Sequence, residues 1–213
     1  MDAHPGIYVL AGTNGAGKSS IAGEVFRRSG GAFFNPDEIA KAIVRENPGM
    51  PIAEANGRAW QRGFQLLRAS IEQGYRYAFE TTLGGQTITA TLLDAAERGT
   101  RIYVWYCGLA TPDLHVARVA ARVRRGGHDI PERKIRERYD ESRRNLVRLM
   151  PYLEVLRVYD NSEESAKPKP RLILEANRRR VASMDLDATP EWAKPIVAAA
   201  LALDPKLAQR LGA

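Results

Sequence analysis

Cysteine and long apolar runs are both scarce in this chain. Of 213 residues only Cys107 is a cysteine, so a disulfide framework within the chain is excluded, and such usage is typical of a reducing compartment. No apolar run approaches the roughly 20 residues of a membrane span. The first apolar stretch leads directly into a glycine-rich segment, so we do not expect it to be a signal peptide. These absences predict a cytoplasmic protein without membrane association.

Acidic residues are outnumbered, with 25 Asp and Glu against 32 Lys and Arg, which gives a net charge of +7. Much of the positive charge lies between Arg118 and Arg148, and a second cluster follows at residues 178–180. No aromatic residues alternate with these arginines, as stacking platforms for nucleic-acid bases would. We therefore favour the anion-facing lid of a phosphotransferase over a nucleic-acid surface.

A phosphate-binding motif stands near the start of the chain. Residues 12–19, GTNGAGKS, match the pattern G-x-x-x-x-G-K-[ST] in full. An apolar strand is predicted before the motif, at residues 7–11, and helical spacing follows it. Glycines let backbone N–H groups turn inward on a phosphate, and the helix N-terminus adds a partial positive charge. We expect Lys18 to reach the β- and γ-phosphates of a nucleoside triphosphate, and the Ser19 hydroxyl to bind Mg²⁺.

Strand and helix signals alternate along the chain, which predicts an α/β protein. The expected architecture is a three-layer P-loop NTPase fold with a parallel five-stranded sheet, a helical lid and a small C-terminal appendage. The five strands are expected at residues 7–11, 32–34, 75–79, 102–107 and 155–159. A long helix over residues 52–73 has an apolar stripe that includes Trp60, and an edge hairpin is expected at 171–184. We divide the chain into a kinase domain, 1–180 with a lid at about 115–135, and a helical appendage, 181–213, packed on it.

Two acidic residues follow predicted strands, at the edge where the C-terminal ends of parallel strands share a ligand crevice. Asp37 can accept a proton from a substrate hydroxyl during phosphoryl transfer, or help to hold Mg²⁺. Its alternative role is to cap a helix. Glu80 ends the third strand with Thr81 and Thr82, and this trio suits a polyhydroxylated substrate. A plain loop acid is the alternative there.

Three arginines share one face of the predicted lid helix. Arg118, Arg122 and Arg125 are spaced i, i+4 and i+7, and like charges at this spacing destabilise a helix by roughly a few tenths of a kcal/mol per pair. A row that faces an anion explains them better than a solvated basic face, because guanidinium groups match phosphate oxygens. The glycines at 126–127 would let this segment hinge over the site. On the next helix, Arg138 is expected to flank the cleft.

These motifs occur together, in this order, in the zeta toxin–like P-loop kinases, which the chain resembles over about residues 5–180. The matching segments are residues 12–19, FFNPDEIA at 33–40, FETTL at 79–83, the stretch from 118 to 131, and YDNS at 159–162. The resemblance implies an ATP-dependent kinase that phosphorylates the sugar 3′-hydroxyl of UDP-N-acetylglucosamine or a related UDP-sugar. It also raises an antitoxin protein as a partner. The lid here is shorter than in the better-known plasmid toxins and carries Gly-Gly-His-Asp, and Pro36 stands between Asn35 and Asp37.

Position by position, the resemblance implies that Lys18 and Ser19 are the lysine and the metal-binding serine of the phosphate loop, and that Asp37 is the catalytic base. It also implies that Arg122 and Arg118 contact the transferring phosphate. The expected catalytic residues are Asp37, Lys18, Arg118 and Arg122. The expected cofactor-binding residues, for ATP and Mg²⁺, are Gly12, Asn14, Gly15, Ala16, Gly17, Lys18, Ser19, Ser20 and Arg125, with Ser19 and Asp37 on the metal. The expected substrate-binding residues are Asn35, Glu80, Thr81, Thr82 and Arg138.

Two other functions stay open at this point. A P-loop kinase for a nucleoside, an antibiotic or a polynucleotide end would use the same motifs, and the last predicts nucleic-acid binding that falls steeply with salt. A non-catalytic ATP-binding regulatory module is the second alternative. A pure binder needs only the phosphate loop, so Asp37, Glu80 and the arginine row favour catalysis.

Overall fold

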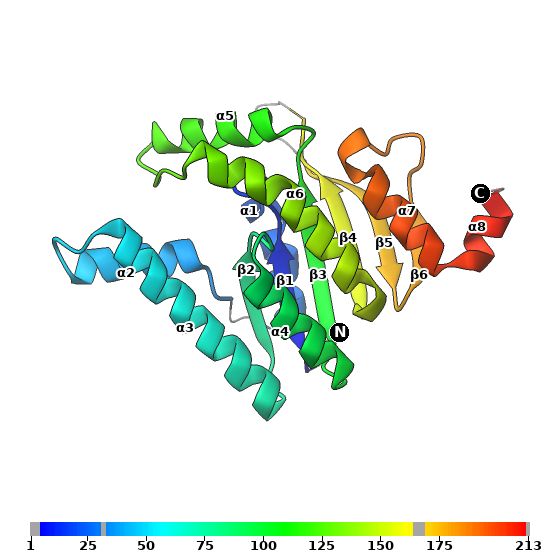
Figure 1. Cartoon of the computed structure of the whole chain (residues 1–213), viewed down its shortest axis with the longest axis horizontal. Helices are drawn as coiled ribbons and strands as arrows, with labels where there is room; N and C mark the ends of the chain where they lie inside the picture. Colours follow the sequence, from blue (N-terminus) through cyan, green and yellow to red (C-terminus); the bar gives the residue numbers. More distant parts are fainter. Residues whose placement is uncertain (1–4, 31–32, 164–168, 212–213) are drawn as a thin grey trace.

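A central β-sheet with helices on both faces makes up the computed structural model, which describes residues 5–30, 33–163 and 169–211 (Figure 1). The strands are β1 (Ile7–Ala11), β2 (Tyr77–Thr81), β3 (Ile102–Gly108), β4 (Val155–Asp160), β5 (Arg171–Asn177) and β6 (Arg180–Met184). The helices are α1 (Ser19–Ser29), α2 (Pro36–Glu46), α3 (Ile52–Gln73), α4 (Gln86–Glu97), α5 (Pro112–Val123), α6 (Glu132–Leu149), α7 (Lys194–Leu203) and α8 (Pro205–Leu211), with short 3₁₀ turns at Met150–Tyr152 and Glu191–Ala193. None of the helices in these ranges has the length and apolar character to cross a membrane.

The sheet has the strand order β2-β1-β3-β4-β5-β6. The first four strands in this order are parallel, and β5 and β6 continue the sheet as an antiparallel hairpin at its edge. In the register, Ala11 at the end of β1 lies beside Thr81 of β2 and Tyr106 of β3. The predicted α/β class and edge hairpin are thus confirmed, and the C-terminal ends of the parallel strands meet at one edge.

The predicted strand at residues 32–34 is reduced to one bridge, between Phe34 and Phe79, while residue 32 lies outside the described residues. The cause is the helix start that follows at once. Asn35 caps α2 by accepting hydrogen bonds from the N–H groups of Asp37 and Glu38, and Pro36 supplies a helical φ at the first position. The sheet therefore has four parallel strands and an antiparallel pair, six in all, where five parallel strands were expected.

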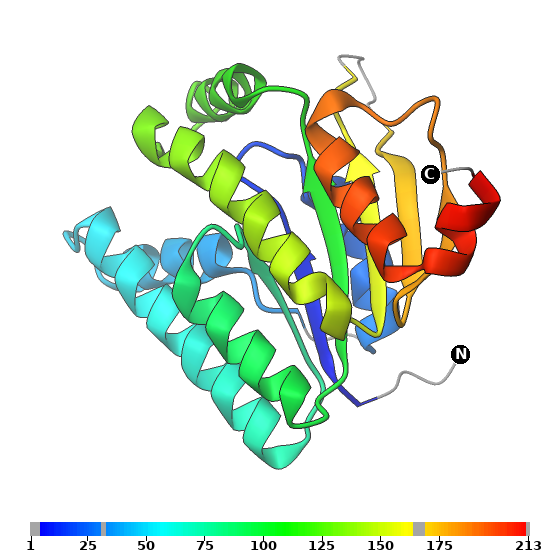
Figure 2. The same ribbon diagram turned by 45° about the vertical axis from the view of Figure 1, so that its right-hand side comes forward.

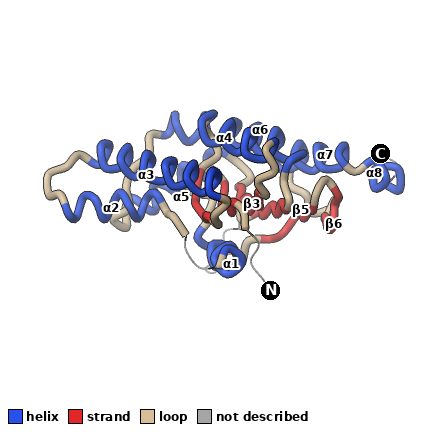
Figure 3. The backbone as a smooth tube through the Cα atoms, turned by 90° about the horizontal axis from the view of Figure 1, so that it is seen from below, coloured by secondary structure: helices blue, strands red, loops and turns tan. Residues whose placement is uncertain are grey.

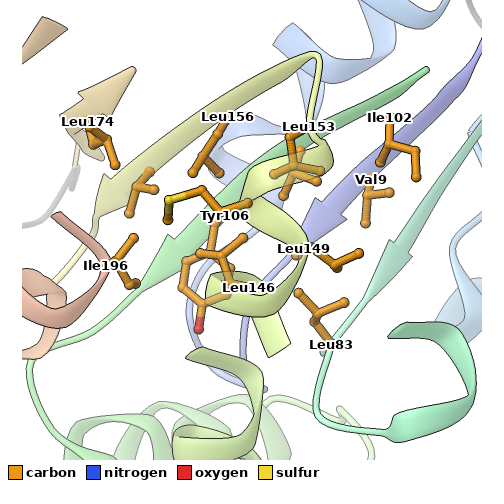
Figure 4. Packing of buried hydrophobic residues seen from close by; sticks show 14 of the residues in the cluster. Val9, Leu83, Ile102, Tyr106, Leu146, Leu149, Leu153, Leu156, Leu174 and Ile196 are labelled. Atoms are coloured by element: carbon orange, nitrogen blue, oxygen red, sulfur yellow. The ribbon is translucent and has the colours of Figure 1, made fainter. Parts of the chain in front are cut away.

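Helices α3, α4, α6 and α7 cover one face of the sheet and α1 covers the other (Figures 2 and 3). On the larger face Val9 of β1, Tyr106 of β3 and Leu156 of β4 pack against Leu146 of α6 and Ile196 of α7 (Figure 4). Every residue of β1 and of β3 is buried, which is the expected pattern for central strands with helices on both faces.

The predicted boundary at residue 180 falls at the start of β6, which joins the same sheet as β1. The tail beyond it is docked on the domain: Trp192 is buried, a Cβ at Gly108 would lie 2.4 Å from its ring, and its Nε1 donates a hydrogen bond to Asp160 Oδ1 at 3.1 Å. The division into two domains stays a prediction.

Trp60 does not belong to the buried stripe of α3 in which it was expected. Its side chain is 47% exposed, and Ile52 at the start of the helix is 45% exposed. The buried apolar residues of α3 are Ala55, Ala59 and Leu67. The apolar spacing predicted the helix correctly but not which apolar side chains face the core.

Candidate functional site

The phosphate loop lies between β1 and α1, and its glycines hold conformations that only glycine adopts easily. Gly15 and Gly17 have φ values of +82° and +78°, in the left-handed region. A Cβ at Gly17 would lie 2.2 Å from Asn161 Nδ2, and one at Gly12 would lie 2.1 Å from the carbonyl oxygen of Cys107. The loop is therefore in close contact with the ends of β3 and β4, and a side chain at either position would displace it.

Lys18 is buried beneath this loop. Its ammonium group donates hydrogen bonds to the carbonyl oxygens of Gly12, at 2.7 Å, and Thr13, at 3.4 Å. Its Nζ also lies 3.4 Å from Glu80 Oε1, at the end of β2. The side chain of the expected phosphate-binding lysine is thus held by two loop carbonyls and one carboxylate, and the pairing with Glu80 was not anticipated from the sequence.

Two further side chains support the loop at Asn14. The buried ring of His115, on α5, donates through Nδ1 to the carbonyl oxygen of Asn14 at 2.8 Å. Burial lowers the pKa of His115 to about 4, and the nearby cations add to the shift, so the ring is neutral at pH 7. Arg138, on α6, donates from Nη1 to Asn14 Oδ1 at 2.8 Å, and its own carbonyl oxygen accepts from the Thr13 hydroxyl at 3.2 Å.

Asp37 and Glu80 are brought together by the cap of α2. The Asn35 side chain, whose oxygen caps the helix, also donates from Nδ2 to Glu80 Oε2 at 3.3 Å. On the other side Asp37 Oδ2 lies 3.6 Å from Arg122 Nη1, and Arg122 Nη2 donates to the carbonyl oxygen of His128 at 3.1 Å. The helix cap considered for Asp37 is provided by Asn35 instead, and the carboxylate of Asp37 faces Arg122.

A cleft of about 960 Å³, which we call the loop cleft, runs along the phosphate loop beneath α5. Arg118 and Arg122 of α5 line it, as their spacing predicted, and Arg125 lines it from the turn after α5, not from the helix on which it was expected. The residues around it that were expected to be functional are Gly15, Gly17, Lys18, Ser19, Ser20, Asn35, Asp37, Glu80, Arg118, Arg122 and Arg125.

A second cleft of about 700 Å³, the α3 cleft, lies between the N-terminal half of α3, the end of β2 and the α5–α6 turn. It is lined by the expected residues Asn14, Thr81, Thr82 and Arg138, and by Asn56, Gly57 and Trp60 of α3, which were not expected. Lys18, Asp37, Glu80 and His128 line both clefts. The two clefts therefore meet at one lysine, two carboxylates and one imidazole.

Several expected residues lie in the site but with a different contact from the one anticipated. Ala16 is fully buried, and its carbonyl oxygen accepts a hydrogen bond from the Asn161 side chain at 2.9 Å. This residue therefore supports the loop through packing and through that hydrogen bond. Arg118 donates to the carbonyl oxygen of Glu163 at 3.2 Å, at the far side of the loop cleft. The hydroxyls of Thr81 and Thr82 accept from the N–H groups of residues 83 and 84 and hold the turn after β2.

The sequence did not single out His115, Trp60 or Asn161 as parts of the site. The spacing of apolar residues gave no signal for His115 and assigned Trp60 to the core, not to the site. Asn161 directly follows a buried strand, at the edge of the sheet where the C-terminal ends of the parallel strands meet. The same criterion had pointed to Asp37 and Glu80, and it could have pointed to Asn161 as well.

Comparison with known proteins places the chain in a family. The profile of the AAA_33 family, described as an AAA domain, matches residues 7–147. An uncharacterized protein of Haemophilus influenzae is 32% identical over 133 residues, which are 60% of this chain and 88% of that protein.

Two groups of solved structures share the fold. A chain in the structure of AvrRxo1-ORF1:-ORF2 with ATP has a TM-score of 0.64 at 15% identity, and the match covers 93% of this chain but only 64% of that one. A chain from the PezAT chromosomal toxin–antitoxin system of Streptococcus pneumoniae has a TM-score of 0.57 at 16% identity, covering 97% of this chain and 88% of that one. With its α/β P-loop fold and a family profile that spans two thirds of its length, this chain belongs to the AAA_33 family.

Proposed function

We propose that this protein is an ATP-dependent kinase that transfers the γ-phosphate to a hydroxyl group of an acceptor bound in the α3 cleft. The observation that carries the proposal is that the loop cleft and the α3 cleft share Lys18, Asp37 and Glu80. A protein that only binds a nucleotide needs the first cleft alone. A phosphotransferase needs two, joined where the phosphate passes from donor to acceptor.

The donor half of the site suits ATP with Mg²⁺. The left-handed glycines and buried Lys18 form a cradle that side chains would fill, and a structural neighbour was determined with ATP. Hard oxygen donors, the preferred ligands of Mg²⁺, line the same cleft in the Ser19 hydroxyl and the Asp37 carboxylate. These two residues would hold the ion, which supplies charge neutralisation at the β- and γ-phosphates.

Asp37 and Arg122 have complementary roles in this proposal. Asp37, shared by both clefts, orients the acceptor hydroxyl and takes its proton. Arg122 Nε is buried and, within the described part of the chain, has no hydrogen-bond partner, so it is a donor that a phosphate oxygen would satisfy. With Lys18, this guanidinium stabilises the charge of the phosphoryl group in transfer.

We further propose that the acceptor is the sugar 3′-hydroxyl of UDP-N-acetylglucosamine or a related UDP-sugar. The supporting argument is the resemblance to the zeta toxin–like kinases, together with an α3 cleft of about 700 Å³ lined by threonines, two asparagines and the cations Lys18, Lys134 and Arg138. The part of the proposal that concerns ATP and Mg²⁺ does not depend on which class of acceptor is phosphorylated.

An antitoxin protein is the proposed partner. Its support is the shared fold with a chain of the PezAT toxin–antitoxin system and with a chain of a two-component AvrRxo1 complex. Co-expression with the product of an adjacent reading frame, followed by size-exclusion chromatography with light scattering, tests for a stable complex. Elution of this chain without the second protein would contradict the partnership.

The test of function is a mass-spectrometric screen of acceptors with ATP and Mg²⁺. UDP-sugars, nucleosides, aminoglycosides and a short oligonucleotide are incubated with the protein and with Lys18→Ala and Asp37→Asn. We expect one UDP-sugar to gain a single phosphate, with about 10²-fold or greater loss of turnover in both variants. Lys194→Ala and Asp94→Asn, surface residues outside both clefts, are the matched controls.

The outcomes separate the parts of the proposal. A phosphorylated nucleoside or oligonucleotide would contradict the UDP-sugar but support the kinase. Bound ATP with no phosphorylated acceptor would contradict the kinase and favour a regulatory ATP-binding module. Full activity in Asp37→Asn would contradict the role given to that carboxylate.

A further inference from the structure

We propose that Trp60 determines the specificity of the α3 cleft by stacking on a planar heterocyclic ring of the acceptor. The inference rests on the proposed function in one respect, which is that the α3 cleft holds the acceptor. Neither the phosphate-loop motifs nor the carboxylates of the site require an aromatic residue on α3.

Trp60 is the one tryptophan that is not buried. Its side chain is 47% exposed, whereas Trp105 and Trp192 are 1% and 3% exposed. An exposed indole on a cleft wall carries a large apolar surface that stays in contact with water until a ligand covers it. Trp60 lines the α3 cleft directly, so the surface it exposes is available to what binds there.

The indole is also held in place. Its ring stacks on Phe64, one helical turn further along α3, with centroids 5.2 Å apart and an interplanar angle of 13°. Phe64 is half-buried and packs against the main core under the sheet. One face of the indole is therefore braced by a ring that is itself anchored, and little side-chain freedom remains to be lost when a ligand stacks.

There is room for a ring beside it. Gly57 lies three residues before Trp60 and also lines the α3 cleft. A Cβ at Gly57 would have no neighbouring atom within 4 Å, so this turn of the helix is open. Glycine in a helix interior is unfavourable because of its backbone freedom, and its use here leaves a gap that any other side chain would partly fill.

The polar and charged residues of the α3 cleft indicate what kind of ligand carries the ring. Lys134 and Arg138 bring positive charge to the wall formed by α6, and Asn56 and Thr82 bring hydrogen-bonding groups. The carboxylates in the same cleft, those of Asp37, Glu80 and Asp129, can accept hydrogen bonds from hydroxyl groups of a ligand. A ligand that matches all of these has a flat π-face at one end and anionic or hydroxyl groups at the other. A nucleobase attached to a sugar phosphate has this combination, while an aliphatic chain or a bare sugar phosphate lacks the planar ring.

Binding measured by calorimetry, with a non-hydrolysable ATP analogue saturating the loop cleft, tests the inference without turnover. UMP and AMP are the probes that carry a planar base, and ribose 5-phosphate is the matching probe without a base. We expect at least one nucleotide to bind more tightly than ribose 5-phosphate. Trp60→Leu should weaken that nucleotide about 5- to 100-fold, the range of one base–aromatic stack, and leave ribose 5-phosphate unchanged.

Controls on the same helix separate stacking from damage to the fold. Trp60→Phe should restore most of the affinity, because a smaller ring still stacks. Leu66→Ala removes a comparably exposed apolar side chain of α3 that does not line the cleft, and should have no effect. Gly57→Leu should fill the gap and weaken nucleotide binding while Trp60 is still present.

Equal binding of both nucleotides and ribose 5-phosphate, or an unchanged affinity in Trp60→Leu, would overturn the inference. Its failure can be distinguished from failure of the proposed function. Phosphorylated acceptor with a KM independent of Trp60 contradicts the stacking role alone. Trp60-dependent nucleotide binding, with no phosphorylated product in the acceptor screen, contradicts the kinase alone.

Discussion

Acidification should destabilise the protein through His115, because the imidazole that supports the phosphate loop is buried and neutral. Its pKa is lowered from 6.5 to about 4, first by burial and then by the charges of Lys18, Arg118 and Arg143, while the hydrogen bond to Asn14 partly opposes the shift. In the unfolded chain the ring returns to a pKa near 6.5. Between the two values the unfolded state binds a proton that the folded state does not.

The sign and size of the effect follow from linkage. Stability falls as the pH drops through 6.5 and stops falling near pH 4, where the folded ring also becomes protonated. With these two pKa values, the free energy of unfolding should decrease by about 2 kcal/mol from pH 7.5 to pH 5, and by about 3 kcal/mol in full.

Urea unfolding at pH 7.5, 6 and 5, followed by circular dichroism, measures how much His115 contributes to the pH dependence of the free energy of unfolding, when wild type is compared with His115→Asn. The asparagine amide can occupy the position of Nδ1 and donate to Asn14, but it does not titrate. The stability difference between the two proteins should therefore shift by about 2 kcal/mol in favour of the variant between pH 7.5 and pH 5. Parallel pH profiles would refute the assignment of a buried neutral imidazole, since every other titrating group is common to both proteins.

Two further substitutions test the loop and the sheet. Gly17→Ala should weaken ATP binding about tenfold or more, measured by calorimetry, because φ is +78° and the new Cβ would meet Asn161 Nδ2 at 2.2 Å. Partial recovery of affinity in the double variant with Asn161→Ala would attribute the loss to that contact. Unchanged affinity in Gly17→Ala would contradict the prediction. Arg157→Met should cost about 1–3 kcal/mol in urea unfolding, because the largely buried guanidinium pairs with both Glu24 and Glu175 and its removal leaves two carboxylates without it. Addition of Glu175→Gln should recover part of that loss, and a stability equal to wild type in the single variant would show that the network contributes nothing.

The local parts of the site could be read from the sequence because they are set within a few residues. The phosphate loop depends on glycine conformations and on one lysine at fixed spacing, and the start of α2 depends on an Asn-Pro pair that caps a helix. The pairing of Arg118 with Arg122 was also predictable, since i and i+4 positions share a helix face whatever the helix packs against, whereas Arg125 lies in the turn after α5. All three of those arginines line the loop cleft.

Other features depended on contacts between distant segments. Spacing could not reveal that Lys18 pairs with Glu80, 62 residues away, or that Asn14 is supported by side chains from both α5 and α6. The expected strand at 32–34 failed because the cap of α2 ends it after a single bridge. Trp60 was placed in the core because a stripe of apolar residues gives a face but not its exact orientation.

By itself, then, the sequence determined the α/β class, the phosphate loop and the edge of the sheet at which ligands would bind, because these follow from backbone conformation and from the period of apolar residues. Only the tertiary structure decided that the loop cleft and the α3 cleft meet at Lys18, Asp37 and Glu80, and that an exposed tryptophan lies on the wall of the second. The physical reason is that the rotation and the position of α3 and α5 against the sheet are fixed by packing with remote parts of the chain. No local pattern encodes those contacts.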